Sequence, residues 1–338
     1  MVISSGQFPS LMRNQMNDAA GSAVKMTMSA VDEAAMEAFH LKFFRKGGKL
    51  SALSYTEQDY EPGPGMAHWP EQTAIPEQTF YEGYPLKVTS NHFAGKFIYS
   101  YITHKAGKPE LLNSGPKLLG QSEVRTREQL THALLIWGAT ALASIDKWDG
   151  VPLVNPICGD GQPLFSASHR WRSDDAILNS NLLSSYYHPT QTGVFQVNKQ
   201  IGRWRDPQGD AMMVRVRQLL VPIEMELVCQ VFAKSQKDPL SSNNAENMFN
   251  TLVPDGYIAN PRLPSVSDWF FLTNKKDYRP QIRELIPPET FMIPFSTETM
   301  ASGVTMVTSY AVGVGGPAGW LGIGKVTGTP PDITGSLT

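Results

Sequence analysis

The chain has 338 residues, of which 41% are hydrophobic and only 18% are charged. Its 29 basic and 31 acidic residues give a net charge of −2, which argues against a dedicated nucleic-acid reader because such proteins carry a strong basic excess. The 28 glycines and 25 prolines favour turns and loops over a helical bundle. This length allows two domains or one elaborated domain.

The cysteines and the N-terminus give expectations about the cellular compartment. Two cysteines, Cys158 and Cys229, are too few to staple this fold, so we expect reduced thiols in a cytoplasmic setting, with a lone secreted disulfide as the poorer alternative. No basic stretch followed by an apolar run opens the chain, so no signal peptide is expected. The charge-free interval between Glu298 and Lys325 is rich in Gly, Ser and Thr, unlike a membrane helix, so we expect a soluble protein.

The first sixty residues are polar and rich in methionine, and one helix is predicted among them, over 29–46. Ser29 can cap this helix, and a pair of glycines can end it. Its phenylalanines pack either on the same chain or on a neighbouring subunit, and the sequence favours neither. Five prolines in 61–85 then exclude a helix, and a β-like run over 86–102, interrupted by Gly95, follows.

The clearest helix is predicted over about 122–146. Thr126 and Gln129 have the spacing of a capping box. Apolar side chains recur there every three or four residues, as on one face of a helix: Leu130, Leu134, Trp137, Ala141 and Ile145. Trp137 is therefore expected to be a core anchor that packs against a C-terminal strand.

Two shorter helices are expected further along the chain. Pro222 suits a first helical position and acidic residues follow it, so a helix is predicted to open there. The apolar face of that helix is predicted to consist of Ile223, Leu227, Val231 and Phe232. Another short helix is expected around 244–252, and seven prolines exclude a mainly helical structure over 254–294.

The C-terminal region alternates with a period of two, which predicts a long strand. Bulky side chains form one face of this strand: Val304, Met306, Thr308, Tyr310, Val312 and Val314. Mostly small residues form the other face: Thr305, Val307, Ser309, Ala311, Gly313 and Gly315. A face of small residues allows another strand, helix or chain to approach closely.

Candidate catalytic and metal-binding groups are sparse. Cys158 and His169 could form a nucleophile and base, but no nucleophile turn surrounds Cys158, and a small buried thiol beside a turn is the preferred interpretation. The stretch 159–161 is too short for a calcium loop, and the glycine run over 313–319 lacks dinucleotide-binding spacing. The seven histidines include neither HExxH nor a helical i, i+4 pair. We predict no catalytic, cofactor-binding or metal-binding residues, and no cofactor.

Four arginines cluster within fifteen residues, interleaved with apolar side chains: Arg203, Arg205, Arg215 and Arg217. They could form a nucleic-acid patch. The preferred interpretation is that they alternate along strands and pair with acidic groups of a neighbour.

Three segments, read in order, resemble the major capsid protein of tailed double-stranded DNA bacteriophages, a family with the Hong Kong 97-type fold. Residues 160–169 (DGQPLFSASH) are similar to the family's D-G-K-x-L-F-S-x-x-H, with Gln162 in place of lysine. The second segment, 220–222 (LVP), is similar to the start of L-x-V-P-P-x-L-E. The third, NPRL at 260–263 followed by WFFL at 269–272, resembles x-D-P-R-L … W-Y-L. Two further positions depart from the pattern, since Arg170 and Ile223 stand where proline is usual.

The resemblance implies an α+β fold with an N-terminal arm, an extended β-hairpin loop, a peripheral domain with a long spine helix, and an axial domain. The implied bounds are 1–55 for the arm, 56–105 for the loop, 106–165 and 298–338 for the peripheral domain, and 166–297 for the axial domain.

The function that the resemblance implies is structural and not enzymatic. Such a chain assembles with itself into pentamers and hexamers of an icosahedral head shell, in the virion, after assembly in the host cytoplasm. The implied partners are scaffold, portal and decoration proteins and packaged double-stranded DNA held by weak non-specific contact, with no membrane. Two alternatives stay open: an encapsulin-like nanocompartment shell that encloses a cargo enzyme, and a cytoplasmic β-rich hydrolase.

Overall fold

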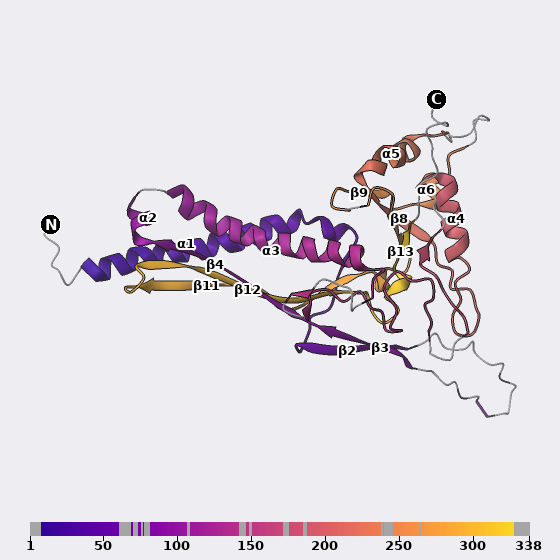
Figure 1. The fold of residues 1–338 in the computed structure, drawn as a ribbon, viewed down its shortest axis with the longest axis horizontal. Coiled ribbons are helices and arrows are strands. Elements are labelled where there is room, and N and C mark those ends of the chain that lie inside the picture. The colour runs from indigo at the N-terminus through magenta and orange to yellow at the C-terminus, as the bar shows by residue number, and fades with distance from the viewer. Residues whose placement is uncertain are drawn as a thin grey trace.

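The computed structural model describes most of the chain. The described residues are 8–60, 69, 74–75, 77, 82–106, 109–141, 147–148, 151–171, 176–184, 188–237, 239, 246–263 and 265–327. In the elongated part of the molecule, α1 (Phe8–Met36) and α3 (Pro109–Trp137) lie along a sheet that contains β4 (Asn91–Ser100), β11 (Gln281–Ser296) and β12 (Ala301–Gly313) (Figure 1). Helices and sheets together confirm the predicted α+β class.

The predicted C-terminal strand is β12, at the centre of this first sheet. The strand order is β1 (Arg45–Lys46), β11, β12 and β4, and β12 is antiparallel to both of its neighbours. The bulky face predicted from the alternation is buried, with Val304, Met306 and Tyr310 all nearly inaccessible. On the predicted small face, Gly315 lies so close to the backbone carbonyls of Tyr278 and Arg279 that a Cβ atom would clash. The predicted strand and its close approach are confirmed.

A second, five-stranded sheet forms the other part of the molecule. Its order is β7 (Leu182–Leu183), β13 (Ile323–Val326), β10 (Trp269–Thr273), β8 (Val216–Pro222) and β9 (Tyr257–Asn260). Every residue of the central strand β10 is buried, as a strand covered on both faces requires. The helices around it, to the right of Figure 1, are α4 (Gln191–Ile201), α5 (Glu226–Lys234) and α6 (Phe249–Leu252).

Shorter elements complete the fold. The hairpin of β2 (Ser54–Tyr60) and β3 (Glu82–Thr89) lies below the first sheet in Figure 1. The remaining elements are α2 (Tyr101–Lys105), β5 (Lys147–Trp148), β6 (Val151–Pro152) and the 3₁₀ turns η1 (Phe39–Lys42), η3 (Ile223–Met225), η4 (Lys276–Tyr278) and η5 (Gly319–Leu321). No helix in the described part of the chain is both long enough and apolar enough to cross a bilayer.

The prediction of a first helix over 29–46 is wrong, because the helix is α1 and ends at Met36. Ser29, expected as its cap, lies inside α1. Small and flexible side chains spaced mainly by three or four residues face the sheet and α3: Met12, Met16, Ala20, Ala23, Thr27, Ala30 and Val31. Such residues give a weak hydrophobic signal, which hid this helix. Phe43 and Phe44 are buried in the main core of the same chain, which resolves the alternative left open by the sequence.

The bounds predicted for the long helix, 122–146, are also wrong. The helix α3 begins at Pro109 and ends at Trp137, so it is about 43 Å long at 1.5 Å per residue. Thr126 is not a cap, since its hydroxyl donates to the Ser122 carbonyl within the helix. Gly115, Pro116 and Gly120 lie inside the first half of this helix and disfavour it by propensity, and tertiary packing overrides that preference.

Two further local predictions are corrected. The β-like run over 86–102 is interrupted at Ser90, between β3 and β4, and not at Gly95. Gly95 lies inside β4, where an added Cβ would come within 2.8 Å of Leu119 on α3.

The short helix expected around 244–252 is confirmed only as α6, and the absence of a mainly helical structure over 254–294 is confirmed. Predictions for 61–85 fall largely outside the described residues.

The helix predicted to open at Pro222 begins later and faces the other way. Pro222 ends β8, the 3₁₀ turn η3 follows, and α5 starts at Glu226. The predicted apolar face fails except for Phe232. The side chains that reach the core are Met225, Cys229 and Phe232, whereas Ile223, Leu227 and Val231 are 50%, 69% and 45% exposed. Ile223, Leu227 and Val231 do share one face of this segment, but the opposite face is also apolar and is the one that reaches the core.

The sheets also cut across the predicted domain bounds. The strand β11, predicted to belong to the axial segment 166–297, pairs with β12 in the first sheet. The strand β13, predicted to belong to the returning segment 298–338, pairs with β10 in the second sheet. Within the predicted loop 56–105, β4 is part of the first sheet. The C-terminal part of the chain therefore contributes strands to both sheets in turn.

Trp137 is the last residue of α3 and packs half-buried against the main core. Its predicted companion Ala141 lies beyond the helix, and Ile145 lies outside the described residues. Among the described residues of this helix, the fully buried apolar side chains are Leu134 and Leu135. The side chains that anchor α3 in the core therefore lie up to one turn before Trp137, the residue expected from the sequence.

We predict that Leu134→Ala lowers the free energy of unfolding by about 2–5 kcal/mol, because it removes a fully buried side chain and leaves a cavity. Leu118→Ala, on the same helix but 63% exposed, is the matched control and should change stability by less than about 0.5 kcal/mol. Urea unfolding monitored by circular dichroism measures both. Equal effects of the two substitutions would contradict the packing of α3 described above.

Candidate functional site

The structure brings together three groups that the sequence treats separately. Cys158, Asp160 and His169 place a thiol, a carboxylate and an imidazole within 4.8 Å of one another. His169 Nδ1 lies 2.8 Å from Asp160 Oδ2, which is the orienting contact of a nucleophile–base–acid arrangement. Only the pairing of Cys158 with His169 was visible in the sequence. The role of Asp160 was hidden because its turn resembles an incomplete calcium loop.

The surroundings of this cluster argue for a structural role. Cys158 is 3% exposed and His169 is completely inaccessible, and burial raises the pKa of the Cys158 thiol well above its usual value. Asp160 also accepts hydrogen bonds from the backbone N–H groups of Gln162 and Arg170. The carboxylate therefore ties a turn to the segment that follows it. A protonated, inaccessible thiol is a poor nucleophile and a poor metal ligand.

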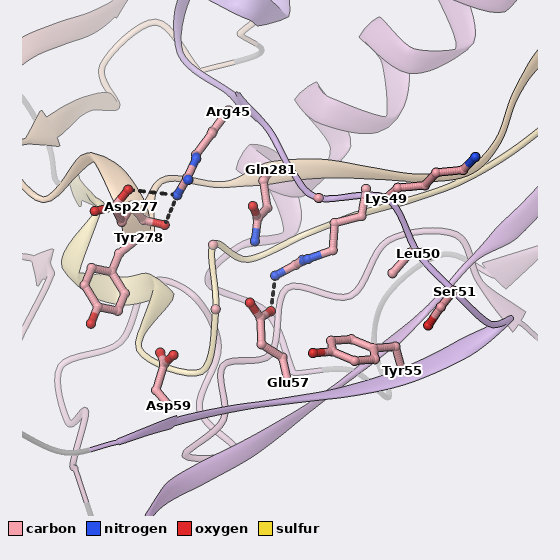
Figure 2. A pocket seen from close by; sticks show the side chains of 14 residues that line it. Arg45, Lys49, Leu50, Ser51, Tyr55, Glu57, Asp59, Asp277, Tyr278 and Gln281 are labelled. Atoms are coloured by element: carbon pink, nitrogen blue, oxygen red, sulfur yellow. Dashed lines mark hydrogen bonds and ion pairs between the residues drawn. The ribbon is translucent and has the colours of Figure 1, made fainter.

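A polar recess of about 580 Å³ lies where the chain after η1, the hairpin strand β2, and the start of β11 meet. Figure 2 shows Tyr55, Glu57 and Asp59 along β2 on one side of it, with Arg45 and Gln281 opposite.

The charges of the recess are mostly paired within the chain. Arg283, whose side chain is 5% exposed, forms an ion pair with Glu57, and Arg45 lies 3.0 Å from the carboxylate of Asp277. Asp59 faces the recess without an ion pair in the described part of the chain. Burial and the nearby Glu57 raise its pKa. The ion pair between Arg283 and Glu57 holds the hairpin against the first sheet. The residues that line the recess do not form a pair of nucleophile and base.

A second buried polar cluster joins η1, α3 and β9. Glu128 Oε1 accepts from the backbone N–H of His40 and lies 2.8 Å from His40 Nδ1. One turn further along α3, His132 Nε2 contacts the side-chain amide of Asn260. The rings of Phe39 and Phe43 pack on His132. Because Asn260 ends β9, this cluster connects the N-terminal segment and the long helix to the second sheet.

Next to it, Arg127 of α3 pairs with Glu123 of the same helix and with Glu284 of β11. Its guanidinium lies 4.6 Å from the ring centre of Tyr310 in β12. Ion pairs and a cation–π contact at one arginine fix the helix across two strands. The polar groups of α3 therefore position elements of the fold.

Comparison with protein-family models gives no match, and comparison with curated proteins gives none either. Solved structures do match. The capsid of the cyanophage P-SCSP1u has a TM-score of 0.52 at 8% identity, over 86% of this chain and 88% of that one. A chain of Mycobacterium phage Patience has a TM-score of 0.50 at 10% identity, over 94% of this chain and 88% of that one. The chain has the Hong Kong 97-type capsid fold.

At the level of the fold, the resemblance found in the sequence is confirmed. A virus-like particle from Pyrococcus furiosus is a further match, with a TM-score of 0.44 at 9% identity, over 90% of this chain and 98% of that one. In this capsid fold, the motif residues Asp160 and His169 form the buried pair described above, and Pro222 and Asn260 end adjacent parallel strands. The absence of catalytic, cofactor-binding and metal-binding residues stays a prediction.

We predict that neither cysteine of this capsid-fold chain reacts with a water-soluble thiol reagent while the protein is folded. Both are buried, and burial also raises the pKa of Cys229 to about 12, so little thiolate exists at neutral pH. Ellman's reagent should detect two thiols after denaturation in guanidinium and almost none before. Rapid modification of Cys158 in the native protein would instead support a reactive nucleophile.

Stability should fall as the pH decreases from about 7.5 to 5.5. Burial lowers the pKa of His132 in the folded state, so below about pH 6.5 the unfolded chain binds a proton that the folded chain excludes. This contribution is fully present above the unfolded pKa and is lost as the pH falls. Melting temperatures of His132→Gln should show a smaller acid-induced decrease, whereas the exposed control His92→Gln should behave as wild type. The same decrease in His132→Gln as in wild type would contradict this origin.

Proposed function

We propose that the chain is the major capsid protein of a tailed bacteriophage and that its copies assemble into the icosahedral head shell around the double-stranded DNA genome. The observation that carries this proposal is the extent of the fold similarity. The match reaches 86% of this chain against the cyanophage capsid and 94% against the chain of phage Patience. Similarity over most of the length supports a shared architecture more strongly than similarity over one domain does.

The surface also supports a protein that contacts copies of itself. Apolar side chains that are exposed singly are normal on a monomer, whereas a group of them on one face indicates a contact surface. Ile223, Leu227 and Val231 form such a group on η3 and α5, with exposures of 50%, 69% and 45%. The low content of charged residues fits interfaces, whose centres are depleted of charge.

The domain layout belongs to this proposal, with bounds that follow the elements. The hairpin β2–β3 is the extended loop, and α1 belongs to the N-terminal arm. The first sheet with α3 as its spine helix forms the peripheral domain. The second sheet with α4, α5 and α6 forms the axial domain.

The proposed role is structural and not enzymatic, and no cofactor belongs to it. The primary partner is the chain itself, in pentamers and hexamers of the virion capsid, after assembly in the host cytoplasm. Scaffold, portal and decoration proteins are further partners. Contact with packaged DNA is weak and non-specific, because the net charge of −2 gives little attraction to phosphate.

The test is to express the full chain, alone and with its neighbouring phage genes, and to examine the product by sedimentation and negative-stain electron microscopy. Closed shells or ring-shaped capsomers are expected. A protein that stays monomeric at high concentration in every condition would contradict the proposal. Nuclease-resistant DNA inside particles from infected cells is expected, whereas an enclosed enzyme in place of DNA would favour the nanocompartment.

A further inference from the structure

The outward face of η3 and α5 is an apolar stripe. Ile223, Leu227 and Val231 follow one another every four residues and are all well exposed, while the core-facing side of the same segment is also apolar. Glu224 and Glu226 lie at the N-terminal end of the stripe, and neither makes an ion pair in the described part of the chain. A short helix that is apolar on both sides is expected to be covered on both sides.

A second exposed feature precedes β8. In the segment 203–215, which a bridge between Arg205 and Ala211 closes into a hairpin, buried and exposed residues alternate only at the two ends, over 203–205 and 213–215. The residues directed inward are Trp204 and Val214, and those directed outward are Arg203, Arg205 and Arg215. The predicted alternation of the four arginines along strands is wrong, since only Arg217 lies in a named strand, β8, and it pairs with Asp255 of the same chain. Pairing of the other three with a neighbour stays a prediction. We name this segment the arginine hairpin.

The arginine hairpin combines free positive charge with a flexible apolar side chain. Among the described residues, Arg203, Arg205 and Arg215 have no ion-pair partner, whereas Arg217 is paired with Asp255 at 2.9 Å. Met213 is 77% exposed and has a positive φ of 50°, an uncommon conformation for a side chain other than glycine. The turn carries two acidic residues: Asp206 accepts hydrogen bonds from the backbone N–H groups of Gln208 and Asp210, and Asp210 is exposed. The hairpin is thus held in shape by its own chain.

The two features lie at opposite ends of the same strand. The arginine hairpin leads into Val216 at the start of β8, and η3 with α5 leaves from Pro222 at its end. Seven residues of strand separate them by about 20 Å. They therefore cannot meet within one subunit, but they can meet between two subunits arranged head to tail.

We propose that the arginine hairpin of one copy of this chain docks on the apolar stripe of α5 in the next copy. Met213 covers the stripe around Leu227, and the free arginines pair with Glu224 and Glu226. Because the two surfaces differ, the contact is heterologous, and repeated contacts of this kind close into rings. This inference rests on the proposed shell function and identifies the surfaces that join copies within a capsomer.

Disulfide trapping tests the contact in assembled particles. The variant Met213→Cys/Leu227→Cys should give, on oxidation, a ladder of covalent oligomers that ends at the pentamer or hexamer. An intrachain disulfide is excluded by the separation along β8, since bridged Cα atoms lie within about 7 Å. The native cysteines are buried and should not interfere. The matched control, Met213→Cys/Leu118→Cys, moves the second cysteine to an equally exposed site on α3 and should give no ladder.

A charge exchange provides an independent readout. Glu224→Arg/Glu226→Arg should lower the yield of assembled particles by at least about tenfold, because like charges then face each other. Adding Arg203→Glu/Arg205→Glu should restore assembly. Wild-type particles with no ladder and no rescue would overturn this contact and leave the shell function standing. Absence of wild-type particles under all conditions would instead overturn the shell function, and the contact with it.

Discussion

The fold depends on how closely the long helix α3 can approach its neighbours. Gly115 lies directly on the ring of Phe97 in β4. Gly120 lies against the backbone of α1 at Thr27, and a Cβ atom added to Gly120 would come within 3.0 Å of the Cβ of Ala30. At both places a side chain would force the helix away. Two glycines and Pro116 are costly within a helix, and the chain accepts that cost because they allow two long helices and a sheet to pack as one layered unit.

This close packing aligns the polar groups that connect the rest of the molecule. Once α3 lies on the sheet, Arg127 reaches Glu284 and Tyr310, and His132 reaches Asn260 at the end of β9. The second sheet and the N-terminal segment are thereby fixed to the same helix. Buried ion pairs contribute little net stability by themselves, but losing one partner leaves an unpaired buried charge, so they favour a single arrangement. A subunit that repeats many times in a shell needs such a defined shape.

The sequence predicted what has a strong local signal and missed what packing decides. The alternation from Val304 to Val314 identified β12, and the ordered motifs around Asp160 and Pro222 indicated the fold. The N-terminal half of α3 was missed because Gly115, Pro116 and Gly120 disfavour a helix locally. The same holds for the cluster of Cys158, Asp160 and His169. The sequence suggested only the pair of Cys158 and His169, whereas the structure adds the carboxylate of Asp160 and shows the burial that gives the cluster a structural role.

Two identical substitutions in helical glycines test the close approach of α3 most directly. Gly120 contacts the backbone of α1, whereas Gly21, inside α1, has open space around it. Glycine to alanine raises helix propensity by about 1 kcal/mol at either site, so only the surroundings differ. Urea unfolding should show Gly21→Ala more stable than wild type and Gly120→Ala less stable. Stabilisation by both substitutions would contradict the central role of this contact.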